Sequence, residues 1–296
     1  MTSGWAPAPS AEHVRDLPAA YLRCEEITRL EAKNFAYGIR LLPGPKRQAM
    51  SALYAFARRV DDVGDGPGAA TDKLAALTGI RSQVARLGSG AVGDDPVLLA
   101  LEDACERFPI PRSALLELVT GCEMDCRQQR YETFDELTVY CRCVAGSIGR
   151  LSLGVFGSAD PVRSPALADA LGIALQVTNI LRDIVEDRDV MGRVYLPAED
   201  LARFGCAEDA SGPLPALCDL VRYEAGRARE RYAEGLPLLD LLDHRSRACV
   251  AAMAGIYRRL LDRIESDPLA VLDHRVALPA WEKAWVAARS LAGAGA

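Results

Sequence analysis

MSALYAFARRVDDVGD, residues 50–65, is an apolar run that ends in a cluster of aspartates. Its apolar residues recur at three- and four-residue intervals, which predicts a helix with a buried face. Side chains one, two and three turns apart share a face of such a helix. Here that face carries Tyr54, Arg58, Asp61 and Asp65. A mostly buried helix therefore ends in an Asp-x-x-x-Asp pair, while Asp62 points away from the shared face.

A second stretch, LGIALQVTNILRDIVED at residues 171–187, repeats this arrangement. It is again apolar at helical intervals, and it again ends in two aspartates. One face of this helix carries Gln176, Asn179, Asp183 and Asp187. Two buried helices thus place a matching acidic pair at their C-terminal ends.

These pairs are unfavourable as structural features. A helix dipole disfavours anions at the C-terminal end, and like charges one turn apart cost about 0.2–0.5 kcal/mol. One such pair would be read as a solvated helix end, but two pairs continued inward by polar side chains predict a bound cation. Hard oxygen ligands favour Mg²⁺. A di-iron centre needs Glu-x-x-His pairs, and none of His13, His244 and His274 follows a glutamate at that spacing.

Composition narrows the possible partners. The chain has 296 residues and 31.9 kDa, is 50% hydrophobic and 26% charged, and carries a net charge of −6. These values predict a globular core. They argue against a nucleic-acid partner, because a phosphate backbone binds a positively charged surface. Nine cysteines without a Cys-x-x-Cys pair, and a start that lacks a signal-peptide pattern, predict reduced thiols in a cytoplasmic protein. We expect no transmembrane segment, although transient contact with a membrane surface is compatible with the sequence.

The same helical period continues along most of the chain, and Pro and Gly fall mainly between the periodic segments. No stretch alternates in the manner of a sheet. We predict one all-α domain at residues 19–288, a disordered tail at 1–18 and a short tail at 289–296. Glycines in VAGSIG, 144–149, indicate either close helix packing or room for a bulky apolar ligand.

Cationic and aromatic residues near the acidic pairs fit a diphosphate ligand with an apolar tail. Arg58 and Arg182 adjoin the two pairs, and MGRVYLP, 191–197, adds Arg193 and Tyr195 in a loop. Guanidinium groups suit bidentate contact with phosphate, although each arginine alone is equally explained by a surface ion pair. Aromatic residues could line an apolar cavity or belong to the plain core: Phe35, Tyr54, Tyr140 and Tyr257.

Together these segments resemble the squalene/phytoene synthase family of head-to-head prenyl transferases. YAFARRVDDVGD and QVTNILRDIVED followed by GRVYLP are similar to its two aspartate-rich motifs. NFAYGIRLLP, YCRCVAGSIG and YRRLLDRIE match further family segments in the same order. The resemblance covers roughly residues 20 to 285. It implies the isoprenoid synthase fold, a helical bundle around a central apolar cavity with the two acidic motifs facing each other across its mouth.

The resemblance also implies roles for individual residues. Ligands of Mg²⁺ would be Asp61, Asp65, Asp183 and Asp187. Contacts to the substrate would come from Phe35, Arg58, Gln176, Asn179, Arg193 and Tyr195. Catalysis would involve Tyr54, Arg58, Tyr140, Arg182 and Tyr257. One departure is EAKNF, 31–35, where family members often carry a serine, so a hydroxyl contact to diphosphate is not expected there.

The chemistry implied is ionisation of an allylic diphosphate in a water-free cavity, with aromatic faces beside the carbocation. KNFAYGIRLLP and YCRCVAGSIGRLSLGVFG are most similar to bacterial presqualene diphosphate synthases, which join two farnesyl diphosphates without NADPH. We therefore expect presqualene diphosphate as the product. Alternatives are a phytoene synthase that joins two geranylgeranyl diphosphates, or an NADPH-dependent squalene synthase. A terpene cyclase and a non-enzymatic helical protein fit the repeated aspartate pairs less well, and the oligomeric state is left open.

Overall fold

The computed structural model describes residues 16–293, and within that range it contains helices and connecting loops but no strand. The all-α prediction is confirmed. The helices in chain order are α1 Leu17–Glu31, α2 Phe35–Ile39, α3 Gly44–Asp65, α4 Ala70–Arg86, α5 Pro96–Arg107, α6 Arg112–Cys126, α7 Phe134–Cys141, η1 Arg142–Gly146, α8 Ser147–Phe156, α9 Ser164–Asp189, α10 Ala198–Arg203, α11 Leu214–Gly235, η2 Leu236–Leu241, α12 His244–Ser266, α13 Pro268–Asp273 and α14 Ala280–Leu291.

The predicted domain boundaries differ slightly from the ends of these helices. Helix α1 begins at Leu17, and α14 continues to Leu291, so regular structure extends past the predicted 19–288 range at both ends. Most of the predicted N-terminal tail, residues 1–15, lies outside the described residues. The division into one domain and two tails stays a prediction.

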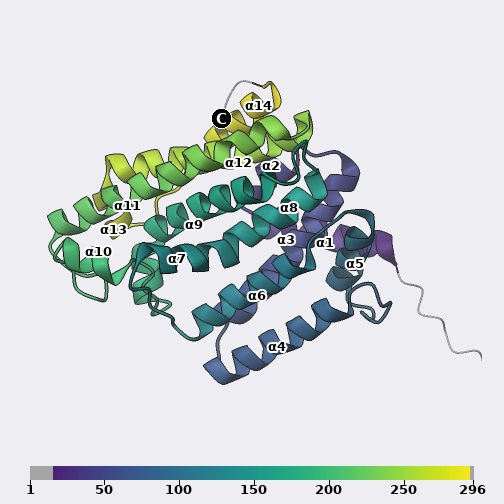
Figure 1. Cartoon of the computed structure of the whole chain (residues 1–296), viewed down its shortest axis with the longest axis horizontal. Helices are drawn as coiled ribbons and strands as arrows, with labels where there is room; N and C mark the ends of the chain where they lie inside the picture. The colour runs from purple at the N-terminus through teal and green to yellow at the C-terminus, as the bar shows by residue number, and fades with distance from the viewer. Residues whose placement is uncertain (1–15, 294–296) are drawn as a thin grey trace, which may run out of the picture.

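Two long helices dominate the arrangement (Figure 1). Helix α3 packs on α1, α5 and α6, and α9 packs on α8, α11 and α12. Proline in the first turn of each helix suits a position where no backbone N–H is needed. Between α3 and α9 lies a cavity whose walls α2, α6, α8 and α12 complete. Helix α9 is long and apolar enough to cross a membrane, but 61% of its 18-residue apolar stretch is buried inside the fold. In this structure it is a core helix.

The chain changes helical geometry where it passes the cavity. A single π turn, η1, joins α7 to α8. There Gly172 of α9 approaches so closely that a Cβ atom would lie 2.6 Å from the carbonyl carbon of Ala145. A Cβ on Gly149 would lie 2.6 Å from the Ala168 carbonyl oxygen. The glycines of the VAGSIG segment therefore serve close packing of α8 against α9, which was one of the two predicted explanations.

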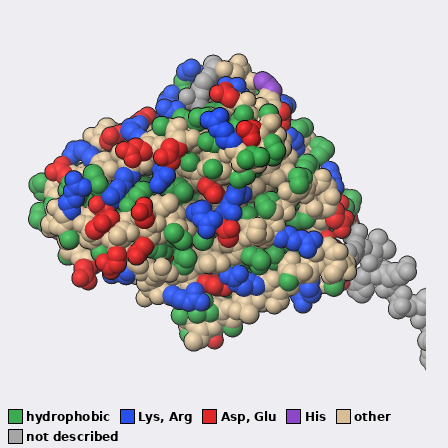
Figure 2. All heavy atoms as spheres, in the orientation of Figure 1, with side chains coloured by type: hydrophobic (Ala, Val, Ile, Leu, Met, Phe, Trp, Pro, Cys, Tyr) green, Lys and Arg blue, Asp and Glu red, His purple; other side chains and the backbone are tan. Residues whose placement is uncertain are grey.

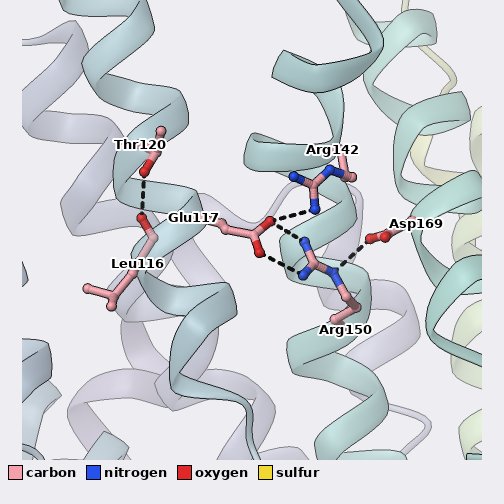
Figure 3. A network of polar contacts seen from close by, with 6 residues as sticks. All are labelled: Leu116, Glu117, Thr120, Arg142, Arg150 and Asp169. Carbon is pink, nitrogen blue, oxygen red and sulfur yellow. Dashed lines mark hydrogen bonds and ion pairs between the residues drawn. The ribbon is translucent and has the colours of Figure 1, made fainter.

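An ion-pair network fixes the helices around this π turn (Figure 3). Arg150 of α8 donates two hydrogen bonds to Glu117 of α6, at 3.0 and 2.6 Å, and a third to Asp169 of α9 at 2.8 Å. Arg142 of η1 reaches the same Glu117 carboxylate at 3.1 Å. The hydrogen bonds that Glu117 accepts, mainly those from Arg150, hold the pKa of this carboxyl group below its usual value. Three helices are thus joined through one half-buried guanidinium, which sets the spacing of the cavity wall.

The face of the molecule shown in Figure 2 carries acidic and basic side chains close together rather than in patches of one sign. Such a surface does not provide the basic stripe that nucleic-acid binding requires. All nine cysteines are free thiols. Burial raises the pKa of several of them, which lowers their reactivity.

Candidate active site

The cavity has a volume of about 470 Å³, within the range of small-molecule sites. All but two of the predicted site residues line it. They are Phe35, Tyr54, Asp61, Asp65, Tyr140, Gln176, Asn179, Arg182, Asp183, Asp187, Arg193 and Tyr195. Residues from segments more than a hundred positions apart in sequence therefore lie around one cavity, and their roles stay a prediction.

The acidic ends of α3 and α9 meet at one end of the cavity. Arg193, in the loop after α9, donates to Asp65 Oδ1 at 2.8 Å and to the Gly64 carbonyl oxygen at 3.1 Å, which ties the two helix ends together. Earlier residues of the same two helices line the rest of the cavity with apolar side chains: Met50, Leu53, Ala168, Leu171 and Leu175. The cavity thus has an acidic end and an apolar end.

Two predicted residues lie outside the cavity lining. Arg58 is 43% exposed, and its side chain pairs with Asp62 at 2.8 Å, one turn along α3. Burial raises the pKa of Asp61, and the charge of Arg58 partly opposes that rise. Tyr257 of α12 is buried behind the wall, with its ring centroid 6.1 Å from that of Phe35. Tyr257 therefore supports an aromatic residue of the wall instead of facing the cavity.

Each acidic pair contains one carboxyl group that resists ionisation. Burial raises the pKa of Asp61 to about 7, and the neighbouring charge of Asp65 adds to the rise. Burial raises the pKa of Asp187 to about 7 in the same way, with Asp183 as the next largest cause. A cation at this end of the cavity would relieve both effects, because it favours the charged carboxylates.

Sequence reasoning missed a fifth aspartate at the cavity, Asp125, at the end of α6. It lines the cavity and accepts hydrogen bonds from Tyr195 at 2.7 Å and from Tyr140 at 3.0 Å. The two tyrosine rings stack with centroids 5.1 Å apart. Burial raises the pKa of Asp125 to about 6, against the charge of Arg193 and the two hydrogen bonds. The signal was available, because CEMDC ends a third apolar helix in a carboxylate, but that carboxylate has no partner one turn away.

Arginine side chains form ion pairs with the aspartates at the acidic end. Arg182 donates through Nε to Asp183 at 2.8 Å. Arg275, which the sequence did not single out, lies in the segment between α13 and α14 and reaches the same carboxylate at 3.0 Å. Together with Arg193 they place three guanidinium groups beside the aspartates, a set that suits an anionic ligand carrying several oxygens.

The donor atoms at this end fit a hard divalent cation. Carboxylate oxygens dominate, and the Asn179 side-chain oxygen is buried, lines the cavity and has no hydrogen-bond partner. Among residues 16–293, no three His, Cys, Asp or Glu side chains converge on one point. The donors therefore fit an ion that takes some ligands from waters and substrate phosphates, as Mg²⁺ does, better than a closed protein cage.

Comparisons with known proteins agree with this geometry. The family model described as squalene/phytoene synthase matches residues 28–282. A phytoene synthase of Mycobacterium tuberculosis is 46% identical over 286 residues, covering 94% of this chain and 92% of that protein. A 15-cis-phytoene synthase of Synechococcus elongatus is 36% identical over 94% of each chain.

Solved structures show the same architecture. A dehydrosqualene synthase solved with a ligand superposes with a TM-score of 0.85 at 30% identity, covering 94% of this chain and 97% of that one. A squalene synthase from Alicyclobacillus acidocaldarius gives a TM-score of 0.78 at 30% identity, with coverages of 86% and 96%. The expected isoprenoid synthase fold is confirmed. The expected product is not, because relatives at 46% identity over most of the chain are named phytoene synthase, and the presqualene diphosphate prediction is therefore wrong.

Proposed function

The chain belongs to the squalene/phytoene synthase family, and from this premise we propose that it joins two geranylgeranyl diphosphates head to head to form phytoene. The observation that carries the proposal is the meeting of two acidic helix ends, bridged by Arg193, over an apolar cavity. The names of the relatives support the twenty-carbon substrate.

The acidic end would bind the diphosphates. Asp61, Asp65, Asp183, Asp187 and Asn179 would hold Mg²⁺, which when bound neutralises diphosphate charge and makes it a better leaving group. Arg182, Arg193 and Arg275 lie where they can exchange their carboxylate partners for phosphate oxygens. Charge that develops on the departing diphosphate would then meet guanidinium groups already in place.

The apolar end would hold the prenyl chains and exclude water. Phe35 and Tyr54 present rings to the cavity, with centroids 6.3 Å apart, and aromatic faces stabilise a nearby carbocation. Loss of two diphosphates and two protons balances the joining of two allylic diphosphates into phytoene, so no reductant and no NADPH enter the proposal. We further propose a cytoplasmic location, which the nine free thiols support.

The test is incubation with Mg²⁺ and either geranylgeranyl or farnesyl diphosphate, each with and without NADPH, followed by mass spectrometry of the extracted products. We expect a forty-carbon hydrocarbon from geranylgeranyl diphosphate, formed equally without NADPH. A thirty-carbon product formed faster from farnesyl diphosphate, or a requirement for NADPH, would contradict the proposal.

Replacing Asp125 by Asn tests the residue that the sequence did not reveal. The carboxylate accepts one hydrogen bond on each oxygen, whereas the amide offers only one oxygen, so Tyr140 or Tyr195 loses its acceptor. We expect the turnover number to fall about tenfold, because one buried hydroxyl group is left without a hydrogen-bond acceptor. Asp103→Asn is the matched control, since Asp103 accepts a hydrogen bond from Tyr21 far from the cavity lining. Equal turnover in the two variants would remove Asp125 from the site.

A further inference from the structure

Helix α14 presents an unusual face to solvent. Most of its exposed positions, with the residue that follows its end, fall at helical spacing and form one stripe, called here the α14 stripe: Trp281, Ala284, Trp285, Ala288, Arg289 and Ala292. Trp281 is 71% exposed and Trp285 is 43% exposed. The opposite face of α14 is buried against the fold through Val286 and Ala287. A surface helix normally turns polar side chains outward, so an outward stripe of tryptophan and alanine calls for a partner.

The two charged groups that lie over Trp285 of the α14 stripe are both cationic. Guanidinium groups of Arg259 and Arg289 both lie over the Trp285 ring, each 4.7 Å from its centroid. The one carboxylate of α14, Glu282, is 5% exposed and accepts hydrogen bonds from Arg259 and Arg263 on its inner side. The Glu282 carboxylate is therefore turned inward, and the stripe shows solvent two indole rings, of which Trp285 lies beside Arg289 and beside Arg259, the latter also paired with Glu282.

The α14 stripe lies on the outside of a cavity wall. Helix α14 packs on α12 and α2, and those two helices contribute Met253 and Phe35 to the cavity lining. Figure 1 shows α14 at the edge of the molecule, beyond α12. On its inner side, burial lowers the pKa of Lys283, and the nearby charges of Arg182 and Lys33 add to the fall. One helix thus links the molecular surface to the acidic end of the site.

We propose that the α14 stripe docks on a membrane surface that contains anionic lipids. Indole rings favour the boundary between headgroups and acyl chains, and arginines beside them would pair with lipid phosphates. The charge argues against a second copy of this chain as the occupant, because a symmetric contact through the stripe would bring like-charged arginines together. Docking would hold the cavity wall against the bilayer, where an apolar product can leave. The inference goes beyond the proposed function, and its assay does not depend on turnover.

Sedimentation with lipid vesicles tests the proposal. The full-length protein is mixed with vesicles of phosphatidylcholine and phosphatidylglycerol, or of phosphatidylcholine alone, and the bound fraction is measured. We expect the wild-type chain to bind the anionic vesicles and the double variant Trp281→Ala/Trp285→Ala to bind about tenfold more weakly. Arg289→Gln should weaken binding less and reduce its dependence on salt. Val162→Ala is the control, since Val162 is an apolar side chain that is 90% exposed and does not belong to the α14 stripe.

Two further readings make the result decisive. In a Trp5→Phe background, tryptophan emission should shift to shorter wavelength on anionic vesicles if the indoles enter the interface. Absence of wild-type binding, or equal binding by wild type and the double variant with the same thermal unfolding midpoint, would overturn the proposal. A lipid-free dimer that dissociates in the double variant, measured by sedimentation velocity, would also overturn it and would assign the stripe to a second copy of the chain.

Discussion

The Asp61→Asn variant is expected to lose turnover by about a thousandfold while its fold persists. Asp61 lines the acidic end of the cavity, one turn from Asp65, and an amide at this position keeps the shape but not the charge. The proposed Mg²⁺ would lose a ligand, and departing diphosphate would lose its neutralising partner. Asp183→Asn should behave in the same way from the opposite helix. The measurement is the turnover number with geranylgeranyl diphosphate under saturating Mg²⁺.

Asp62→Asn is the control for this experiment, because it changes the adjacent carboxylate in the same DDVGD segment. Asp62 is more than half exposed and pairs with Arg58 at the surface, an interaction worth about 0–1 kcal/mol. We expect its turnover to match wild type. Comparable losses in Asp61→Asn and Asp62→Asn, or retained turnover in Asp61→Asn, would contradict the assignment of the shared face as the metal-binding face.

The difference in stability between Asp61→Asn and the wild-type protein is expected to depend on pH. The folded state raises the pKa of Asp61 from 3.8 to about 7, so the folded protein holds its proton more tightly than the unfolded chain. The contribution of protonated Asp61 to the free energy of unfolding is fully present below the pKa of the unfolded state. It is lost as pH rises through the pKa of the folded state. Without Mg²⁺, Asn at this position should therefore leave the thermal unfolding midpoint at pH 8 equal to or above that of wild type, with the gap closing towards pH 4.

The Gly172→Ala variant is expected to lose about 3 kcal/mol of unfolding free energy. A Cβ atom at this position would lie 2.6 Å from the carbonyl carbon and oxygen of Ala145 and from the Gly146 nitrogen. All three are backbone atoms of the π turn, so no side chain can rotate away. Helix α9 or η1 must move, and both line the cavity. Urea unfolding gives the measurement, and a fall in turnover should accompany the loss of stability.

Gly226→Ala in α11 is the matched control, because a Cβ there meets nothing within 4 Å. In that open helical position alanine should stabilise the protein by about 0.4–1 kcal/mol, chiefly by restricting the unfolded chain. Opposite signs for the two glycine variants would support close approach of α9 to η1. A Gly172→Ala variant as stable as wild type would show that the two helices separate without cost.

Much of the site followed from helical periodicity. The i, i+4 and i, i+7 spacing placed Asp61 and Asp65 on one face of α3, and Asp183 and Asp187 on one face of α9, before any contact between these helices was known. Local spacing could not reveal Asp125 or Arg275. Neither has a residue of like charge one turn away on its own segment, and only packing brings it to the acidic end.

Other residues show the limit of the same rule. Arg58 shares the helical face of Asp61, yet its long side chain turns to Asp62 at the surface. Tyr257 belongs to a matching family segment, yet it lies one layer behind the cavity, against Phe35. A shared helical face fixes the direction of the Cα–Cβ bond. The position of the end of a long or deeply buried side chain depends instead on the residues packed around it.

The error in product length has a related cause. In the proposed function, the Asp-x-x-x-Asp pairs and the arginines around them would bind diphosphate. This group is common to every prenyl substrate, so the motifs would be alike whether the chain has fifteen or twenty carbons. Substrate length depends on the apolar end of the cavity. That end is built from α2, α3, α8, α9, α12 and the η2 segment, and its depth depends on how their side chains pack together.

By itself, the sequence determined an all-α chain with two buried helices that each end in an acidic pair, because helical period and the cost of burying charge are local properties. Tertiary structure alone decided that Arg193 bridges those ends, that Asp125 receives two tyrosine hydroxyls, and that α14 turns its tryptophans outward. These features depend on contacts between segments far apart in the chain, and no spacing within one segment encodes them.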